Sequence, residues 1–167
     1  MHRVILSVGI AIAFSLATVV ACYGQNAVLP QDEVVKMQKY QGPQDTPEMR
    51  SRLEAERFLA PHIEAARRVL PDVKRRFLGG LPRGSTLFVT VAIQDGLNKE
   101  NAYVAVSRWD SDRIDGIMAT ELRAIHKYKM GQKLIVYEKD VIDWTITSET
   151  GEEEGNFIGK FMDAQNR

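Results

Sequence analysis

Hydrophobic residues follow two different periods along this chain, and the change of period separates a helical part from a strand part. From Ser85 onward, apolar residues alternate with other residues over short runs, as in Leu87, Val89, Val91 and Ile93. A period of two is typical of strands with one buried face. Turns rich in Asp, Gly and Asn separate the runs, and a glycine in the third run indicates a bulge or bend at Gly116. We therefore predict about six short strands, at 87–93, 103–109, 113–119, 133–137, 144–148 and 156–162.

The stretch before these strands carries helical signals. Asp45-Thr46-Pro47-Glu48 resembles a helix start, because Asp or Thr caps the first N–H groups and Pro and Glu suit the first turn. Residues 61–78 place their apolar side chains on one helical face. Pro61 and Pro71 lie inside this pattern, and an internal proline removes a hydrogen bond and clashes with the preceding turn. We expect a kinked helix or two helices, ended by Gly79-Gly80.

These patterns predict an α+β fold, with an N-terminal helix or kinked helix pair followed by a small, strongly curled antiparallel β-sheet or barrel. The helical segment 46–84 is expected to pack with the sheet, 85–167, as one domain. Residues 23–45 contain Gly, Pro, Gln and Asn and are predicted to form mostly a linker or tether, with a short helical or extended piece at 32–40.

Residues 1–22 have the three parts of a secretory signal peptide: a basic start, an apolar run and small residues at the end. A retained membrane span is the alternative, but no Lys or Arg cluster follows the apolar run. The end, Val19-Val20-Ala21-Cys22, resembles the lipobox of bacterial lipoproteins, which implies a diacylglycerol on the Cys22 thiol. A plain signal peptide cut after Ala21, Gly24 or Ala27 is the other interpretation. We expect an exported protein, periplasmic or lipid-anchored, with membrane contact through the lipid if Cys22 is acylated.

Composition narrows the functional classes. With 44% hydrophobic and 26% charged residues, the chain is typical of a globular protein. Its formal net charge of zero argues against a nucleic-acid partner, which would call for a basic excess. Cys22 is the only cysteine, which excludes an intramolecular disulfide and a Cys-based zinc site. The basic runs Arg67-Arg68 and Lys74-Arg75-Arg76 are expected on the solvent side of the helix, as a solvated face or as a contact for anionic lipid or an acidic partner.

The second half of the chain contains six short motifs in a specific order. They are Asp95-Gly96, Tyr103-Val104-Ala105-Val106, Asp112-Arg113-Ile114-Asp115-Gly116, Gly131-Gln132-Lys133-Leu134, Asp140-Val141-Ile142-Asp143-Trp144 and Gly155-Asn156-Phe157-Ile158-Gly159. In this order and spacing, residues 86–162 resemble the DUF2314 family, the YegJ-like bacterial proteins of unknown function. The resemblance implies the α+β arrangement given above. It implies no activity, because none is established for the family.

The residues that could carry chemistry form no recognised catalytic motif. His62 and His126 lack the short spacing of metal ligands, so we predict no metal site and no cofactor. No Gly-x-Ser-x-Gly elbow or phosphate-binding loop is present. The carboxylates mostly fall in predicted turns, where Asp is favoured for local hydrogen bonds. They are Asp95, Asp110, Asp112, Asp115, Glu121, Asp140 and Asp143. We assign no catalytic residue.

Asp143 and the adjacent Trp144 admit two interpretations. In the first, Trp144 is a core residue and Asp143 caps a turn. In the second, Trp144, Asp143, Trp109 and Tyr137 line an exposed patch that binds a peptide or glycan.

Three functional hypotheses follow from the sequence. The first is a non-enzymatic envelope protein that acts as a binding or interaction module for a protein or another envelope component. The second is a periplasmic immunity-like protein that neutralises a toxin. The third is a carboxylate-dependent hydrolase of cell-wall material, which would need two carboxylates facing each other across a cleft.

Overall fold

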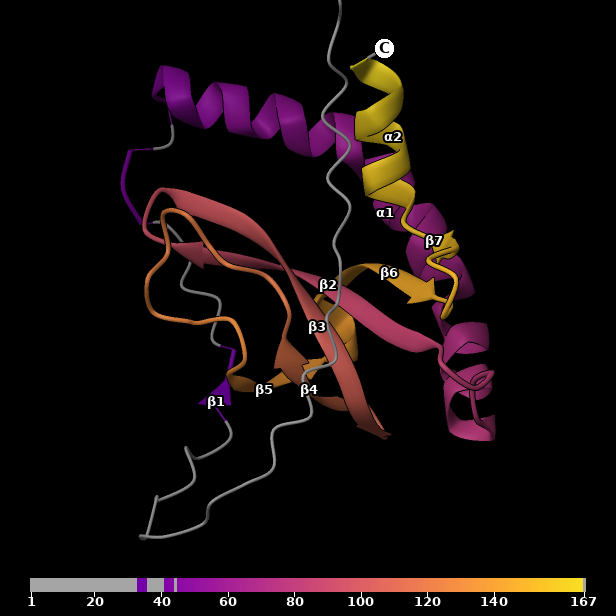
Figure 1. The fold of residues 1–167 in the computed structure, drawn as a ribbon. Coiled ribbons are helices and arrows are strands. Elements are labelled where there is room, and N and C mark those ends of the chain that lie inside the picture. The colour runs from indigo at the N-terminus through magenta and orange to yellow at the C-terminus, as the bar shows by residue number, and fades with distance from the viewer. Residues whose placement is uncertain (1–32, 36–40, 44, 167) are drawn as a thin grey trace, which may run out of the picture.

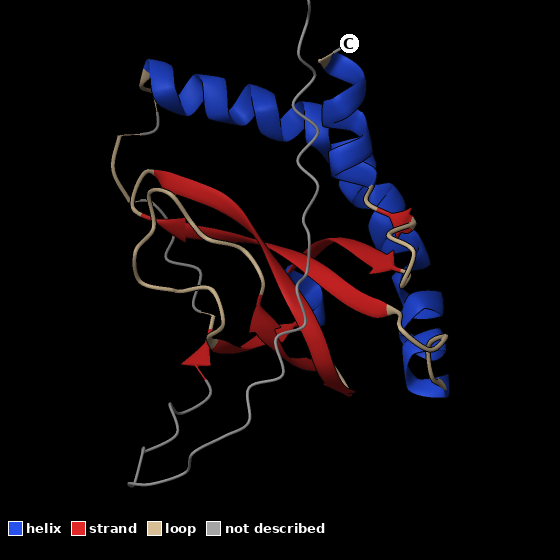
Figure 2. Ribbon diagram, viewed as in Figure 1, coloured by secondary structure: helices blue, strands red, loops and turns tan. Residues whose placement is uncertain are grey.

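In the computed structural model, one long helix packs on a seven-stranded mixed sheet, and a short helix follows at the C-terminus (Figure 1, Figure 2). The structure describes residues 33–35, 41–43 and 45–166. In chain order the elements are β1 (Glu33–Val34), α1 (Pro47–Gly79), β2 (Thr86–Asp95), β3 (Asn98–Asp110), β4 (Arg113–Met118), β5 (Lys133–Tyr137), the 3-10 turn η1 (Glu138–Asp140), β6 (Val141–Thr147), β7 (Glu153–Gly155) and α2 (Phe157–Gln165). The predicted α+β class is confirmed. Within the described part, no helix is both long and apolar enough to cross a membrane.

The sheet is open, which corrects the predicted barrel or strongly curled sheet. Its strand order is β1-β5-β4-β3-β2-β6-β7. The strands β1 and β7 are therefore the two edges of the sheet and do not pair with each other, as closure of a barrel would require. All pairs are antiparallel except β1 with β5, which is parallel. The parallel pair comes from residues predicted to belong mostly to a linker. Glu33 pairs with Leu134 and Val34 with Ile135, so the partners are about a hundred positions apart and no short-range pattern indicates the pairing.

The core lies between α1 and one face of the sheet. The predicted apolar face of β2 is confirmed, because Leu87, Val89, Val91 and Ile93 are all almost fully buried. Thr90 and Ala92 on the other face are buried as well, so burial does not alternate along the strand. The four apolar residues of β2 belong to one hydrophobic cluster with Ala66, Leu70 and Val73, which are three of the four buried residues of α1. This face of the sheet is therefore the one that α1 covers.

α1 is a single 33-residue helix that includes both prolines. Its hydroxyl cap is Thr46, whose side chain accepts from the Met49 backbone N–H, and it ends before Gly80, whose φ is +93°. Figure 1 shows that the helix changes direction strongly along its length. Pro61 and Pro71 each remove one internal hydrogen bond. Of the two expectations, a kinked helix is observed and two separate helices are not.

The β2–β3 hairpin is tighter than predicted. Asp95 pairs with Asn98, so Gly96 and Leu97 alone form the turn, with Gly96 at φ +58°. Residues 98–101, which lie between the predicted strands 87–93 and 103–109, belong to β3. The predicted irregularity at Gly116 is present as a register shift in the facing strand, between Val106 and Arg108.

The predicted last strand at 156–162 is wrong, because this segment forms α2. Gly155 and Asn156 both have positive φ, +82° and +55°, which turns the chain out of the sheet after β7. The apolar residues that follow, at 157, 158, 161 and 162, are spaced for one side of a helix as well as for a strand. The strand in this region is β7, where a turn was predicted.

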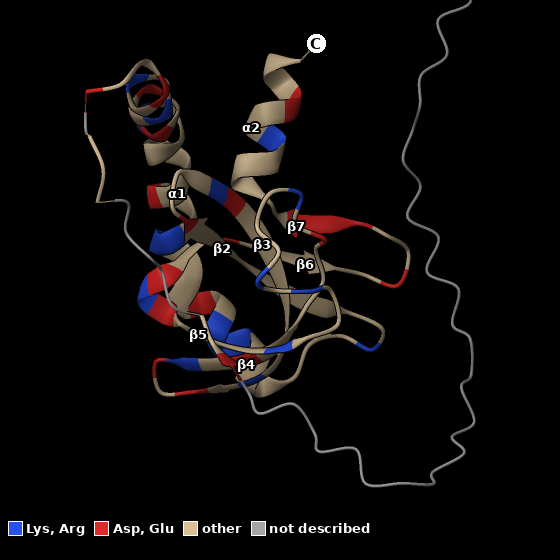
Figure 3. Cartoon of the chain, turned by 90° about the vertical axis from the view of Figure 1, so that its left-hand side faces the viewer, with Lys and Arg blue, Asp and Glu red and all other residues tan. Residues whose placement is uncertain are grey.

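The β4–β5 loop, residues 119–132, lies against the core and is built on three buried side chains, Leu122, Ile125 and Tyr128. Three successive backbone N–H groups, of Arg123, Ala124 and Ile125, donate to the Glu100 carboxylate at 2.7, 2.8 and 2.9 Å. Basic residues are spread along this loop, which lies on the near side of the sheet in Figure 3. The acidic residues around β7 lie apart from the loop.

Candidate functional site

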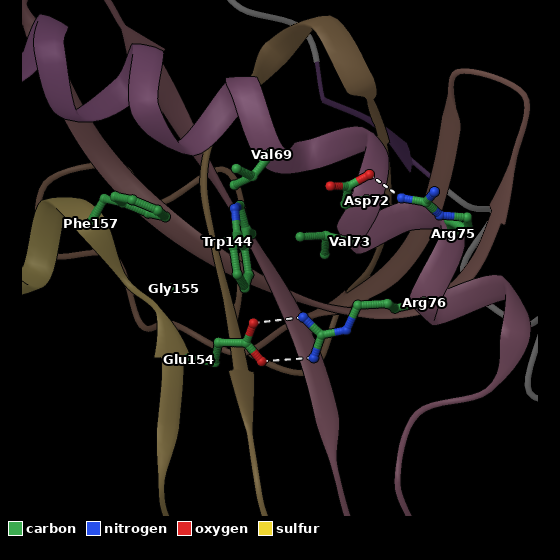
Figure 4. A pocket seen from close by; sticks show the side chains of 9 residues that line it. All are labelled: Val69, Asp72, Val73, Arg75, Arg76, Trp144, Glu154, Gly155 and Phe157. Carbon is green, nitrogen blue, oxygen red and sulfur yellow. Dashed lines mark hydrogen bonds and ion pairs between the residues drawn. The ribbon is translucent and has the colours of Figure 1, made fainter.

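A groove with a cavity of about 500 Å³ opens between α1, the β6–β7 edge of the sheet and the start of α2 (Figure 4). Its lining residues are Val69, Asp72, Val73, Arg75, Arg76, Trp144, Glu154, Gly155 and Phe157. Two parts of the chain that are far apart in sequence, α1 and the continuous segment from β6 to α2, therefore build it. It combines an apolar floor with a charged rim, which is the usual composition of a binding pocket.

Trp144 of β6 is the centre of the floor and is only 3% exposed. Its indole Nε1 donates to the Ala66 carbonyl oxygen of α1 at 3.2 Å, and its ring meets Phe157 edge-on with centroids 6.0 Å apart. Val69 and Val73 of α1 border the same cavity. The hydrogen bond fixes the indole between the two layers, so the floor is rigid before any ligand arrives.

Gly155 allows β7 to approach this indole closely. A Cβ atom at this position would lie 2.3 Å from the Trp144 carbonyl oxygen and 2.7 Å from its ring carbon Cε3. The residue also has φ +82°, a conformation that side chains disfavour. Glycine is therefore needed here both for the backbone turn and for the space.

Two ion pairs form the charged rim. The Arg76 guanidinium donates to both oxygens of Glu154, at 2.6 and 2.7 Å, and one turn earlier Arg75 bonds Asp72. The bond from Arg76 lowers the pKa of Glu154, with burial opposing the effect. Because both pairs are largely exposed, each is worth little to stability. A ligand carboxylate could therefore replace Glu154 on the fork of Arg76 at small cost.

Asp143 lies behind the groove and has a structural role. It is 2% exposed, and its carboxylate accepts from the backbone N–H groups of Trp144 at 2.8 Å and Ile158 at 2.7 Å. Asn156, the residue at the helix start, makes no side-chain cap, so Asp143 caps α2 from the neighbouring strand. Burial raises the pKa of Asp143, while these amide hydrogen bonds oppose the rise. Since its carboxylate is buried and already bonded, Asp143 gives the hydrolase hypothesis no support.

The predicted exposed patch of Trp144, Asp143, Trp109 and Tyr137 does not form. Trp109 is 3% exposed and lies elsewhere in the core, where its Nε1 donates to Glu138 at 3.2 Å and Lys74 lies over its ring. Both tryptophans are core residues, because each indole packs under α1. Tyr137 is half-buried at the end of β5. Of the four, only Trp144 lines the groove.

The basic residues of α1 are not all on the solvent side. Arg67 donates to the Val141 carbonyl oxygen at 2.8 Å, and Lys74 bonds Glu138 at 2.7 Å, so both fasten the helix to the β5–β6 turn. Arg68 and Arg75 pair with carboxylates of their own helix, as a solvated face would. The pair of Arg76 with Glu154 joins residues 78 positions apart. No local signal in the sequence indicates such a pair.

The remaining sequence candidates do not assemble a further site. His62 stacks on Phe161 of α2 with centroids 4.1 Å apart, and His126 is exposed in the β4–β5 loop. Among residues 33–35, 41–43 and 45–166, no three His, Cys, Asp or Glu side chains are grouped as a metal site would require. Cys22, the predicted lipid attachment residue, lies outside the described residues.

Comparisons with known proteins found no relative of this chain. No protein-family model matches the chain, and no curated protein or solved structure matches it either. The resemblance to the DUF2314 family therefore stays a prediction from the motifs themselves, and the groove is the feature on which a function must be argued.

Proposed function

We propose that this chain is an exported bacterial envelope protein whose folded domain is a non-enzymatic binding module. The groove between α1 and β7 is its binding site, and the ligand is a segment of a protein partner that presents an apolar side chain next to a carboxylate. The observation that carries the proposal is the groove itself, in which a rigid indole floor adjoins an exposed arginine fork.

The two halves of the groove suit the two halves of such a ligand. An apolar side chain would cover the partly exposed Val69 and Phe157 beside the buried Trp144 and remove their apolar surface from water, at about 25 cal/mol per Å². A carboxylate would take the place of Glu154 and receive two parallel hydrogen bonds from Arg76. The preformed floor also lowers the entropic cost of binding.

The proposed location in the cell envelope is inferred from the N-terminal residues. Residues 1–22 have the order of parts of a signal peptide, and their end resembles a lipobox. An exported module with a partner-binding groove is compatible with envelope maintenance and with toxin neutralisation. The identity of the captured partner distinguishes these two roles.

Photo-crosslinking in living cells tests the proposal. A photoreactive amino acid in place of Asp72, whose exposed side chain lies on the rim, should capture one dominant protein. The same amino acid in place of Glu64, an exposed residue two turns earlier on α1, is the matched control and should not capture that protein. Equal capture at both positions, or none at Asp72, contradicts the groove as the binding site.

A charge swap separates binding from folding. Arg76→Glu together with Glu154→Arg restores an ion pair across the groove but reverses its polarity. We expect the double variant to keep the unfolding midpoint of the wild type and to lose the captured partner. If capture persists in the double variant, a ligand carboxylate on Arg76 is wrong.

A further inference from the structure

The β4–β5 loop, together with Lys133 at the start of β5, carries a local excess of basic residues. Between positions 119 and 133 there are four basic residues, Arg123, Lys127, Lys129 and Lys133, and one acidic residue, Glu121. This stretch therefore holds an excess of three positive charges, in a chain whose formal net charge is zero. All four basic side chains are exposed.

The loop presents these charges from a fixed backbone. Leu122, Ile125 and Tyr128 anchor it in the core, and Glu100 binds three of its backbone N–H groups. Near its end, the Gln132 N–H donates to the Lys129 carbonyl oxygen at 3.1 Å and closes a turn. Gly131 occupies the third position of that turn with φ +84°, as a type II turn requires.

The tip of this turn is apolar. Met130 is 63% exposed and stands between Lys129 and Lys133. A protruding apolar side chain flanked by cations is the combination that inserts at a lipid interface, where the chain enters the acyl boundary and the cations meet the headgroups.

The entry of the chain into the folded domain lies beside the same loop. Glu33, the first described residue, accepts from the Gln132 side chain at 2.9 Å and lies 3.8 Å from Lys127. Cys22 precedes Glu33 by eleven positions, and eleven residues span at most roughly 36–40 Å. An anchor at Cys22 would thus hold the loop within that reach of the bilayer.

We propose that the β4–β5 loop docks on an anionic lipid surface, with Met130 inserted at the interface and Arg123, Lys127, Lys129 and Lys133 against phosphate headgroups. This goes beyond the proposed function, because the loop is separate from the groove and needs no protein partner. It gives the domain a second membrane contact, independent of acylation at Cys22.

Vesicle binding by the full chain tests the proposal. The probe is a phosphatidylcholine vesicle with or without phosphatidylglycerol. Replacing the four loop cations by Gln should weaken partitioning to the anionic vesicles by roughly tenfold or more at low salt. The matched control replaces Arg50, Arg57, Arg68 and Arg75 of α1, which are also exposed, and changes the net charge equally. Because residues 1–22 are common to all variants, any difference belongs to the substituted positions.

The outcomes are decisive. Loss in the loop variant with retention in the α1 variant supports docking by the loop. Equal loss in both variants indicates attraction by net charge only, and equal binding to vesicles with and without phosphatidylglycerol indicates apolar adsorption. Either of these two results overturns the proposal. Thermal unfolding of both variants shows that each remains folded.

A fluorescent dye can report whether the tip of the loop inserts into the lipid surface. In a Cys22→Ser background, an environment-sensitive dye at Met130→Cys should shift to the blue on anionic vesicles. The same dye at Leu78→Cys, which is 61% exposed at the far end of α1, should not shift. A shift at both positions, or at neither, contradicts insertion of the loop tip.

Discussion

At the scale of single residues, Trp144 joins the two layers of the fold. Its ring is buried under α1, and its indole nitrogen satisfies a carbonyl of that helix at Ala66. The apolar runs around it predict a core position from the sequence alone. The hydrogen-bond partner cannot be predicted in this way, because it lies 78 positions earlier in the chain.

Trp144→Ala should lower the free energy of unfolding by about 3–5 kcal/mol, since it removes a buried indole and leaves a cavity. Trp144→Phe keeps most of the volume and loses the bond to Ala66, so a smaller loss is expected. Urea unfolding followed by circular dichroism measures both. A loss below about 1 kcal/mol for the alanine variant would show that Trp144 is not a core residue.

Gly155 and Gly151 allow backbone strain and close packing to be separated. Both have φ above +80°, so an alanine at either position has a strained backbone worth about 1–2 kcal/mol. Only at Gly155 would the new Cβ also clash with Trp144, since nothing lies within 4 Å at Gly151. We expect Gly155→Ala to reduce stability clearly more than Gly151→Ala in thermal unfolding. Equal effects would mean that β7 moves away from Trp144 at little cost.

At the scale of elements, α2 depends on a carboxylate from outside the helix. Asp143 of β6 supplies the cap that Asn156 does not, and it lies 15 positions before the Ile158 amide that donates to it. Sequence patterns gave the opposite result here, a strand at 156–162, because four apolar residues in six positions fit either period. The left-handed turn at Asn156 and the remote cap decide the outcome, and both are tertiary features.

Asp143→Ala should therefore destabilise α2 before it affects the sheet. We expect about 0.5–2 kcal/mol of lost stability, the range for a lost helix cap, and faster amide exchange confined mainly to Phe157–Gln165. Asp163→Ala removes the same charge from the exposed end of α2 and should leave the exchange rates at the helix start unchanged. Unaltered exchange in Asp143→Ala would contradict the capping role.

The carboxylate that holds the β4–β5 loop makes the stability of the protein depend on pH. Hydrogen bonds from Arg123, and also from Ala124 and Ile125, lower the pKa of Glu100 below its ordinary value of 4.5, while burial opposes them. The carboxylate thus adds stability that is fully present above pH 4.5 and is lost as the pH falls through the lower folded-state pKa.

Unfolding of Glu100→Gln and of the wild type should differ most near neutral pH and converge in acid. The difference near neutrality should exceed the roughly 0.5 kcal/mol that is typical of surface substitutions. Glu121→Gln, which removes a carboxylate from the same loop without touching the three amides, is the control. A difference between Glu100→Gln and wild type that is constant from neutral pH into acid would exclude the ionised carboxylate as its source.

The predictable elements share one property, which is a pattern contained within the element itself. β5 was predicted with the bounds that it has, Lys133–Tyr137, and the alternation in β2 identified its buried face. The open edges of the sheet, the pairing of β1 with β5 and the groove all depend on contacts between distant segments. Seven strands in a mixed order are compatible with the same local patterns as a six-stranded barrel.

At the scale of the whole molecule, the sheet order separates charge of opposite sign. The basic β4–β5 loop precedes β5, next to the β1 edge, whereas Glu149, Glu152, Glu153 and Glu154 surround β7 at the other edge. A protein with no net charge therefore still has a polarity across its sheet. Net charge alone, as read from the composition, gives no indication of it.

The proposed lipid anchor has a direct test at this scale. Cys22→Ser should abolish incorporation of a labelled fatty acid, because serine lacks the thiolate that forms the thioether. In the wild type, the label should follow the protein into the membrane fraction. If labelling is unchanged in the variant, Cys22 is not acylated.

The parallel strand β1 has a mechanical consequence. Among the described residues, its ladder consists of two residue pairs with β5 and one further hydrogen bond, from the Val35 N–H to the Ile135 carbonyl oxygen at 2.9 Å. Force applied to the chain from its N-terminal side reaches the domain through these bonds first. Under tension β1 would detach while the antiparallel pairs of the other strands remain intact. Detachment of this edge strand would lengthen the chain on the N-terminal side before the load reaches the rest of the sheet.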